Sequence, residues 1–174
     1  MLPNPLHPAV VHFPIVLAFL LPLFAIGALV AIRKGARPLR AWAIPLAMAA
    51  ALSLSTWVAV ETGESQGERV ERVVADQPLD AHEDAAELFL TLSLVLLGVA
   101  AVGLARGVVG RAARITAAAG AVALVAVGAR VGHSGGQLVY RYGAASAYVP
   151  ADSLAGRNAP PPDARVAESD DARR

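Results

Sequence analysis

Four histidines are the side chains in this chain of 174 residues best suited to holding a cofactor or a metal ion. Imidazole is an axial ligand of haem iron, and in helical bundles such ligands project inward from facing helices. Imidazole is also a frequent ligand of zinc and copper, beside other histidines or a carboxylate. Whether these side chains can act together depends on the helices that carry them. They are His7, His12, His82 and His133.

The elements that must position these histidines are four long apolar runs. The chain is 56% hydrophobic and 17% charged, whereas soluble domains average about 45–50% and about 25%. An apolar run of about 20 residues crosses the hydrocarbon core of a bilayer as a helix. We therefore predict an all-α integral membrane four-helix bundle in a lipid bilayer over residues 1–143, followed by a disordered polar tail at residues 144–174. The expected spans are about residues 13–32, 41–60, 88–105 and 115–132.

The charges are segregated between the connections, and this predicts the orientation. Residues 33–40 and 106–114 carry arginines, one lysine and no acid, whereas residues 61–87 carry nine acids and two arginines. Basic loops stay in the cytoplasm, so both termini are expected to be extracytoplasmic. The membrane is expected to be the inner (plasma) membrane of a bacterium. Trp42 and Trp57, near the two ends of the second span, fit the aromatic belts of the two interfaces. The net charge of +1 gives no bulk attraction for nucleic acid.

Local patterns between the second and third spans predict how the helices there begin. Val70, Val73 and Val74 have helical spacing and indicate a short amphipathic surface helix. Asp80 is followed three residues later by Glu83, which is typical of a capping box at the start of a helix. The third long helix is therefore expected to begin near residue 80.

With this topology all four histidines fall on the extracytoplasmic side. His7 and His12 precede the first span, His82 opens the third and His133 closes the fourth, so three helices could supply ligands to one centre. His7 and His12 are five residues apart, which is about 140° around a regular helix. The prolines at positions 3, 5, 8 and 14 also argue against a regular helix there. At most one of the two histidines is therefore a safe interior ligand, and we expect it to be His12, which is nearer the apolar run. The predicted cofactor ligands are two of His12, His82 and His133, with His7 in reserve.

Two charged residues belong to the same candidate site. Arg130 lies within the fourth span, where a charge costs at least about 2.5–3.5 kcal/mol on insertion scales, so it faces the bundle interior or extends to the headgroups. Glu61 ends the second span at the same depth and is the natural protein partner of Arg130. A ligand carboxylate, such as a haem propionate, is the other partner. Glu61 is also a candidate metal ligand together with His12, His82 and His133.

Residues 132–136 have the sequence Gly-His-Ser-Gly-Gly, and two roles are open for these glycines. A glycine has no side-chain bulk, so the backbone can lie directly against a flat group such as a porphyrin, or against a neighbouring helix. Gly135 or Gly136 could instead end the fourth helix in a left-handed conformation. We favour the second role, although the two are compatible.

No pattern in the sequence predicts a catalytic residue. The absence of cysteine excludes thiol catalysis and iron–sulfur ligation by this chain, and neither a zinc-protease motif nor a nucleophile elbow is present. Independent catalytic activity is therefore not expected. Three hypotheses remain open: a redox module that binds b-type haem and exchanges electrons with a quinone, a periplasmic cytochrome or a Rieske-type protein; a zinc- or copper-binding membrane protein; and a structural subunit without a cofactor. We favour the first.

Three segments carry a family resemblance: His-Pro-Ala-Val-Val-His-Phe-Pro-Ile at residues 7–15, His82, and Gly-His-Ser-Gly-Gly-Gln-Leu-Val-Tyr at residues 132–140. Residues 6–143 resemble an uncharacterised family of bacterial predicted membrane proteins, a domain of unknown function with four spans. The resemblance implies a four-helix membrane module with histidines at helix ends. Similar modules are joined to c-type cytochrome or Rieske-type segments in some bacteria, which suggests electron transfer. This chain itself contains neither a haem-attachment motif nor a Rieske motif.

Overall fold

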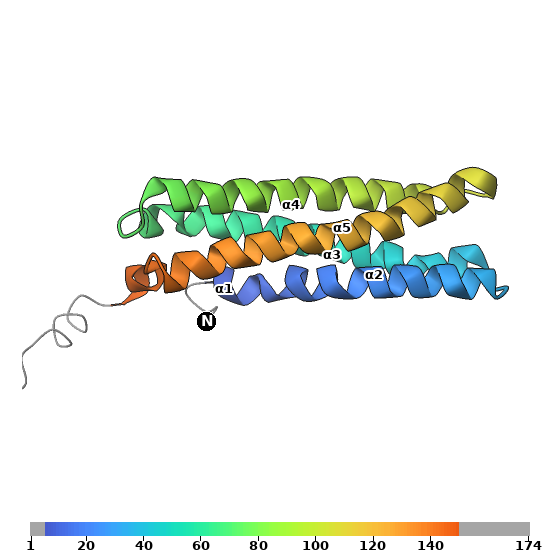
Figure 1. Ribbon diagram of the computed structural model, residues 1–174, viewed down its shortest axis with the longest axis horizontal. Coiled ribbons are helices and arrows are strands. Elements are labelled where there is room, and N and C mark those ends of the chain that lie inside the picture. The colour runs from blue at the N-terminus through green and yellow to red at the C-terminus, as the bar shows by residue number, and fades with distance from the viewer. Residues whose placement is uncertain (1–5, 150–174) are drawn as a thin grey trace, which may run out of the picture.

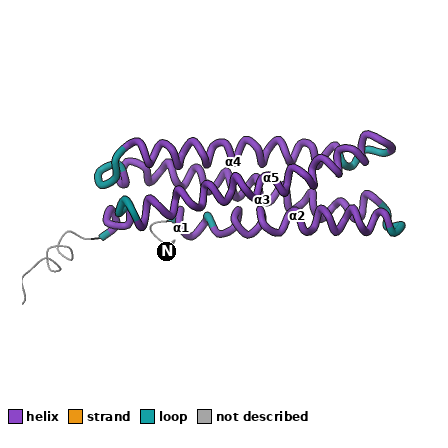
Figure 2. Tube along the Cα trace, viewed as in Figure 1, coloured by secondary structure: helices purple, strands orange, loops and turns teal. Residues whose placement is uncertain are grey.

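The structure, a computed structural model, describes residues 6–149, and every regular element in that range is helical. Four long helices run side by side (Figure 1, Figure 2). The predicted all-α architecture with four membrane-spanning helices is confirmed. The elements are α1 (His7–Val10), α2 (His12–Arg33), α3 (Pro38–Val70), α4 (Asp76–Val102), α5 (Gly107–Tyr140) and the 3-10 helix η1 (Ala144–Tyr148).

Short turns join the long helices, so consecutive helices run antiparallel. α2 packs against α3 and α5, and α4 packs against the same two helices, which closes the four into a ring around one core. α1 lies against α3, and η1 lies against α3 and α5. One end of the bundle therefore contains α1, the α3–α4 turn, the C-terminal part of α5 and η1 (Figure 1). We call it the histidine end, because it carries His7, His12, His82 and His133.

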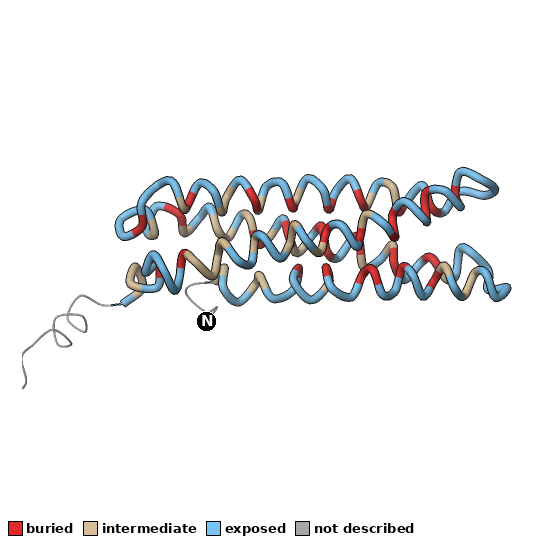
Figure 3. The backbone as a smooth tube through the Cα atoms, in the orientation of Figure 1, coloured by how far each residue is buried: buried red, intermediate tan, exposed pale blue. Residues whose placement is uncertain are grey.

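The bundle is apolar on its outside and has small side chains on its inside. All four long helices are long and apolar enough to cross a membrane. Large side chains such as Phe13, Leu54 and Leu94 are more than half exposed, while the buried positions face inward (Figure 3). Because lipid tails are as apolar as these side chains, close packing of small residues supplies the contact between helices. The core includes Ala18, Ala25, Ala28, Ala49, Ala100, Ala117, Ala118 and Ala121.

The longest helices exceed the thickness of the membrane. α3 has 33 residues and α5 has 34, which makes each about 50 Å long against about 30 Å for the hydrocarbon core. The uncharged run of α3 ends at Val60, and in α4 the uncharged run begins only after Glu87. The histidine end, with residues 61–70 and 76–87, therefore stands outside the hydrocarbon.

The connection between α3 and α4 is shorter than the sequence predicts. α3 continues to Val70 and α4 begins at Asp76, so no separate amphipathic helix forms and Asp80 lies inside α4; both predictions are wrong. Pro78 falls in the first turn of α4, where a backbone N–H has no partner within the helix and is not needed. The turn is held by a second small core of Val74, Leu79, Leu138 and Ala144.

Two polar side chains are buried at the end of the bundle opposite the histidine end. Trp42 is 1% exposed, and its Nε1 donates to the carbonyl of Ala100 across 2.9 Å. Arg114 is also buried and donates to the carbonyl of Gly103, at the end of α4, where carbonyls lack partners within the helix. The prediction that Trp42 lies in an interfacial belt is wrong, because its ring fills the core. Trp57 is half exposed.

The chain after α5 forms one further helical turn. Gly143 takes a left-handed conformation with φ of 73°, which redirects the chain so that η1 packs on α3 and α5. The first residues of the expected polar tail, Ala144–Tyr148, therefore belong to the bundle. Residues 150–174, where the rest of the tail was predicted, lie outside the described residues.

Candidate functional site

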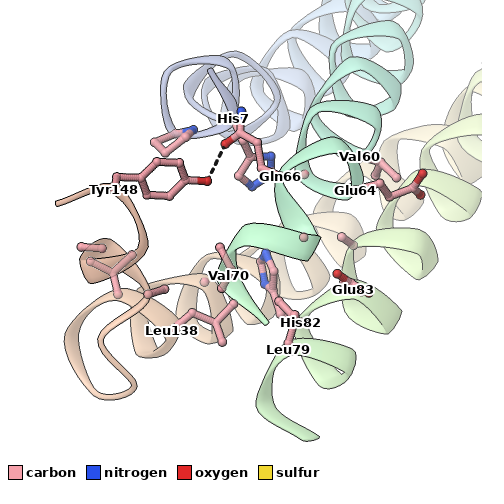
Figure 4. Close-up of a pocket in the computed structure, with 18 of the residues that line it drawn as sticks. His7, Val60, Glu64, Gln66, Val70, Leu79, His82, Glu83, Leu138 and Tyr148 are labelled. Atoms are coloured by element: carbon pink, nitrogen blue, oxygen red, sulfur yellow. Dashed lines mark hydrogen bonds between the residues drawn. The ribbon is translucent and has the colours of Figure 1, made fainter. Parts of the chain in front are cut away.

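A cavity of about 460 Å³ opens at the histidine end. Its walls come from α1, α3, α4, α5 and η1 (Figure 4), so it exists only because five elements converge there. Its volume lies within the range of about 300–1,000 Å³ that is typical of small-molecule sites. His7 and His82 are in the wall. Most of the remaining lining is apolar and includes Val60, Val70, Leu79, Leu138, Val139 and Ala144.

His7 reaches the cavity from α1. Pro8 lies in the first turn of this short helix, and Val11, which joins α1 to α2, keeps helical dihedral angles. His7 and His12 therefore lie on different sides of a nearly continuous helical path. The Nδ1 of His7 donates to the carbonyl of Ala59 on α3 across 2.8 Å. Because a carbonyl can only accept, Nδ1 carries the ring proton and Nε2 keeps its lone pair.

His82 lies about two turns into α4 and has the same tautomer. Its Nδ1 is 2.9 Å from Ser134 Oγ on α5. The hydroxyl of Ser134 donates its own proton to the carbonyl of Val131 across 3.0 Å, so the oxygen accepts from His82. Nδ1 of His82 therefore carries the proton, and its Nε2 also keeps a lone pair.

The two imidazoles form an edge-to-face pair outside the uncharged apolar segments. Their ring centres are 6.5 Å apart and their planes meet at 85°. Burial lowers the pKa of His7, with the bond to the Ala59 carbonyl acting in the opposite direction. Burial, followed by the charge of His7, lowers the pKa of His82, while the Val131 carbonyl acts to raise it. Both rings are therefore neutral at pH 7, and each has an Nε2 that can accept a proton or bind a metal.

Carboxylates from α3 and α4 form the acidic part of the wall. Glu64, Glu83 and Glu87 line the cavity. Burial raises the pKa of Glu83, and the neighbouring charges of Asp80, Glu71, Glu64 and Glu87 raise it further. Carboxylates and the two Nε2 atoms are all acceptors, which suits a metal centre or a ligand with hydrogen-bond donors.

η1 covers part of the cavity and is fastened to α3 by one side chain. The hydroxyl of Tyr148 donates to Gln66 Oε1 across 3.0 Å (Figure 4). The guanidinium carbon of Arg69 lies 5.3 Å from the centre of the Tyr148 ring, within the range of a cation–π contact. Because Gln66 and Arg69 both belong to α3, Tyr148 joins the end of η1 to that helix.

His12 and His133, two of the predicted ligands, do not line the cavity. His12 is exposed, with Nδ1 3.3 Å from the carbonyl of Ala9 in the preceding turn. His133 is exposed as well, and its Nε2 accepts from the amide of Gln137 across 3.1 Å. Of the two N-terminal histidines, the structure therefore turns His7 toward the interior and leaves His12 outside, the reverse of the expected order.

The two charged residues of the predicted site are also exposed. Neither Arg130 nor Glu61 lines the cavity. Within residues 6–149, no three side chains of His, Cys, Asp or Glu are grouped as a metal site requires. The described part of the chain thus brings His7 and His82 together and leaves apart the set of His12, His82, His133 and Glu61.

Sequence reasoning missed Gly63, Gln66 and Tyr148 as site residues. Their residue types carry no signal, because each acts only through a contact between helices. For His7 the sequence carried part of the signal. The five-residue spacing of His7 and His12 is about 140° around a helix, and helical dihedral angles and hydrogen bonds continue through Val11, so only one of the two can face the cavity, but the spacing does not decide which.

The residues of this site fall within a described protein family. The family model described as "Predicted membrane protein (DUF2231)" matches residues 3–147. The chain belongs to this family. The match confirms the resemblance found in the sequence and extends it through most of η1, so every residue of the cavity wall except Tyr148 lies inside the matched range. No curated protein and no solved structure matches the chain.

Proposed function

We propose that the protein is a membrane-embedded electron-transfer module that binds b-type haem in the cavity, where His7 and His82 would hold the haem iron. The supporting observation is the pair of imidazoles, which come from two helices, line one cavity and both keep Nε2 unprotonated. Metal-binding histidines typically donate their other nitrogen to a carbonyl or a similar acceptor, which fixes the ring. Both histidines of this cavity do so.

The number of histidines at the cavity supports haem over a tetrahedral metal site. Haem iron would need no protein ligand beyond the two imidazoles of His7 and His82. A tetrahedral site needs further ligands, and residues 6–149 hold no such group.

The side chains of the cavity have defined roles in this proposal. His7 and His82 hold and orient the cofactor, and their bonds to Ala59 and Ser134 fix the rings and raise the basicity of Nε2. The apolar wall excludes water, which tunes a reduction potential. Haem supplies the one-electron chemistry when it is bound. Arg130, which is exposed on α5 and does not line the cavity, has no role in this proposal.

An absorption spectrum of the purified full chain tests this proposal. We expect a Soret band from protein produced with an adequate haem supply. His7→Ala and His82→Ala should each abolish the band. His12→Ala and His133→Ala are matched controls from the same end of the bundle and should retain it, because neither side chain lines the cavity.

Metal analysis of the same preparations separates the other hypotheses. A colourless wild-type preparation rich in zinc or copper would overturn haem binding in favour of a metal site. A colourless preparation without bound metal would favour the hypothesis of a structural subunit without a cofactor. Loss of the band in His12→Ala or His133→Ala, with helical content preserved by circular dichroism, would overturn the assignment of the ligands.

We further propose that the histidine end is extracytoplasmic, in a bacterial inner membrane, and that a quinone, a periplasmic cytochrome or a Rieske-type protein exchanges electrons there. All nine acidic residues of the described chain lie at residues 61–87, on the histidine end. Residues 33–40 and 106–114, at the opposite end, carry seven basic residues and no acid. Because basic loops are retained in the cytoplasm, this distribution supports the orientation.

Single-cysteine labelling tests the orientation without interference, because the chain contains no cysteine. Ser65→Cys lies on α3 at the histidine end, and Lys34→Cys lies in the turn after α2; both positions are exposed. We expect a membrane-impermeant maleimide to label Ser65→Cys in spheroplasts and Lys34→Cys only after the membrane is opened. The opposite pattern would overturn the orientation.

A further inference from the structure

We infer that Gly63 and Gly135 are positioning residues that act as seats for the two imidazoles. Each glycine leaves a space on one helix that the histidine ring of another helix fills. The seats hold the rings of His7 and His82 against their hydrogen-bond acceptors, in the tautomer that leaves Nε2 free. The consequence for haem binding rests on the proposed function, but the seats themselves are a property of the protein without a ligand.

The seat of His7 lies on α3. A methyl group at Gly63 would be 3.1 Å from Cε1 and 3.2 Å from Nδ1 of His7, closer than the ordinary contact distance of about 3.5–4.0 Å between such atoms. Ala59, whose carbonyl accepts from His7 Nδ1, precedes Gly63 by one helical turn. In a helix the carbonyl of one residue points toward the residue four positions later. A bare backbone at Gly63 therefore opens the approach of His7 to this carbonyl.

The seat of His82 lies on α5. A methyl group at Gly135 would be 3.0 Å from Cε1 of His82 and 3.6 Å from both ring nitrogens. The ring edge that carries Nδ1, Cε1 and Nε2 thus faces the glycine. Ser134, the acceptor of the Nδ1 proton, is the adjacent residue. A side chain at Gly135 would displace both nitrogens at once, so it would disturb the hydrogen bond and move the Nε2 atom.

Neighbouring glycines show that a missing side chain does not by itself make a seat. A methyl group at Gly132 or Gly136, on the same helix as Gly135, would meet no other atom within 4 Å. At Gly67, one turn after Gly63, it would lie 3.7 Å from Glu83 Oε1, an ordinary contact. These three positions are therefore matched controls for the two seats.

The first experiment measures the seats in the protein without a cofactor. The chain has four histidines, so selective ¹⁵N-histidine labelling in nanodiscs gives four ring systems, whose nitrogen shifts report the tautomer. We expect Nδ1–H for His7 and His82 in the wild type. Gly63→Ala should shift the equilibrium of His7 alone, and Gly135→Ala that of His82 alone. Alanine is a better helix former than glycine, and circular dichroism checks that the variants fold.

The second experiment measures haem affinity by titration of the same proteins. Loss of an interaction that orients a metal-bound histidine typically weakens metal affinity about 10–100-fold, and we expect a loss of this size for Gly63→Ala and Gly135→Ala. Gly132→Ala and Gly136→Ala, which lie outside the cavity wall, should bind as the wild type does.

The two measurements fail in different ways. Unchanged ring-nitrogen shifts in Gly63→Ala and Gly135→Ala, or equal changes in the controls, would overturn the seats whatever the haem result. Wild-type protein that shows the expected shifts but binds no haem would overturn the proposed function and leave the seats standing. Expected shifts without the loss of affinity would overturn the inferred positioning role in haem binding.

Discussion

His7 and His82 meet edge to face with their ring centres 6.5 Å apart, and each is bonded to a helix other than its own. His7 joins α1 to α3 through Ala59, and His82 joins α4 to α5 through Ser134. The pair therefore connects four helices at the level of the cavity. The same two hydrogen bonds that close the histidine end also set the tautomer of each ring, so stability and ligand binding depend on one set of contacts.

Acid should destabilise the cofactor-free protein through these histidines. Burial lowers the pKa of His7 and of His82 below 6.5 in the folded protein, so the unfolded chain binds more protons in that range. The free energy of unfolding is therefore unaffected by the titration of the two histidines above pH 6.5. It decreases as the pH falls below 6.5 through the folded-state pKa values of His7 and His82. Thermal unfolding across pH 5–8 measures it.

The double variant His7→Gln/His82→Gln is the control for this pH dependence. Glutamine does not titrate, so we expect a flatter profile below pH 6.5. Glu83, whose pKa is raised, acts in the opposite direction and is present in both proteins, so the difference between the two profiles isolates the histidines. Identical profiles would contradict the prediction.

Ser134→Ala should destabilise the histidine end by about 1 kcal/mol, because it leaves Nδ1 of the half-buried His82 without its acceptor. Unfolding in detergent measures the free energy. Ser65→Ala is the control and should change it by less than about 0.5 kcal/mol, because Ser65 is exposed and bonds only to a carbonyl of its own helix. Equal effects of both substitutions would show that the His82 bond contributes nothing specific.

Tyr148→Phe should loosen η1 without unfolding the bundle. The substitution removes the hydrogen bond to Gln66, worth about 0.5–1.5 kcal/mol, and keeps the ring beside Arg69. We expect faster amide hydrogen exchange confined to residues 144–149. Tyr142→Phe is the control, because the cation–π contact of its ring is with the adjacent residue Arg141 and not with α3. Exchange that rises equally in both variants would argue against the fastening role of Tyr148.

Trp42→Ala should cost at least about 2 kcal/mol of unfolding free energy. The ring is buried, and the substitution both opens a cavity and removes the donor to the Ala100 carbonyl. Trp57→Ala, at a half-exposed position, should stay within about 0.5 kcal/mol. Unfolding followed by circular dichroism compares the two variants, and equal losses would contradict a specific contribution of the buried Trp42 ring to stability.

The glycines of residues 132–136 illustrate how a local pattern can be read two ways. The favoured role, a left-handed end of the fourth helix, is wrong, because α5 continues to Tyr140 and the left-handed residue is Gly143. The other role, a backbone that lies against a flat group, describes Gly135, and the group is the imidazole of His82. A glycine in a sequence indicates that a neighbouring group can approach the backbone closely, but only the tertiary structure shows which group does so.

The sequence by itself determined the four membrane-spanning helices, the segregation of charge between the two ends and the occurrence of histidines on helices that meet at one of them. These features follow from apolar run length and charge, which are properties of each segment alone. The tertiary structure decided that His7 rather than His12 faces the cavity, that His82 finds Ser134, and that His133 and Arg130 are exposed. The physical reason is that periodicity sets directions only within one regular helix. The rotation of each helix about its own axis, and with it the choice of the histidine that faces the cavity, is set by packing against the other helices.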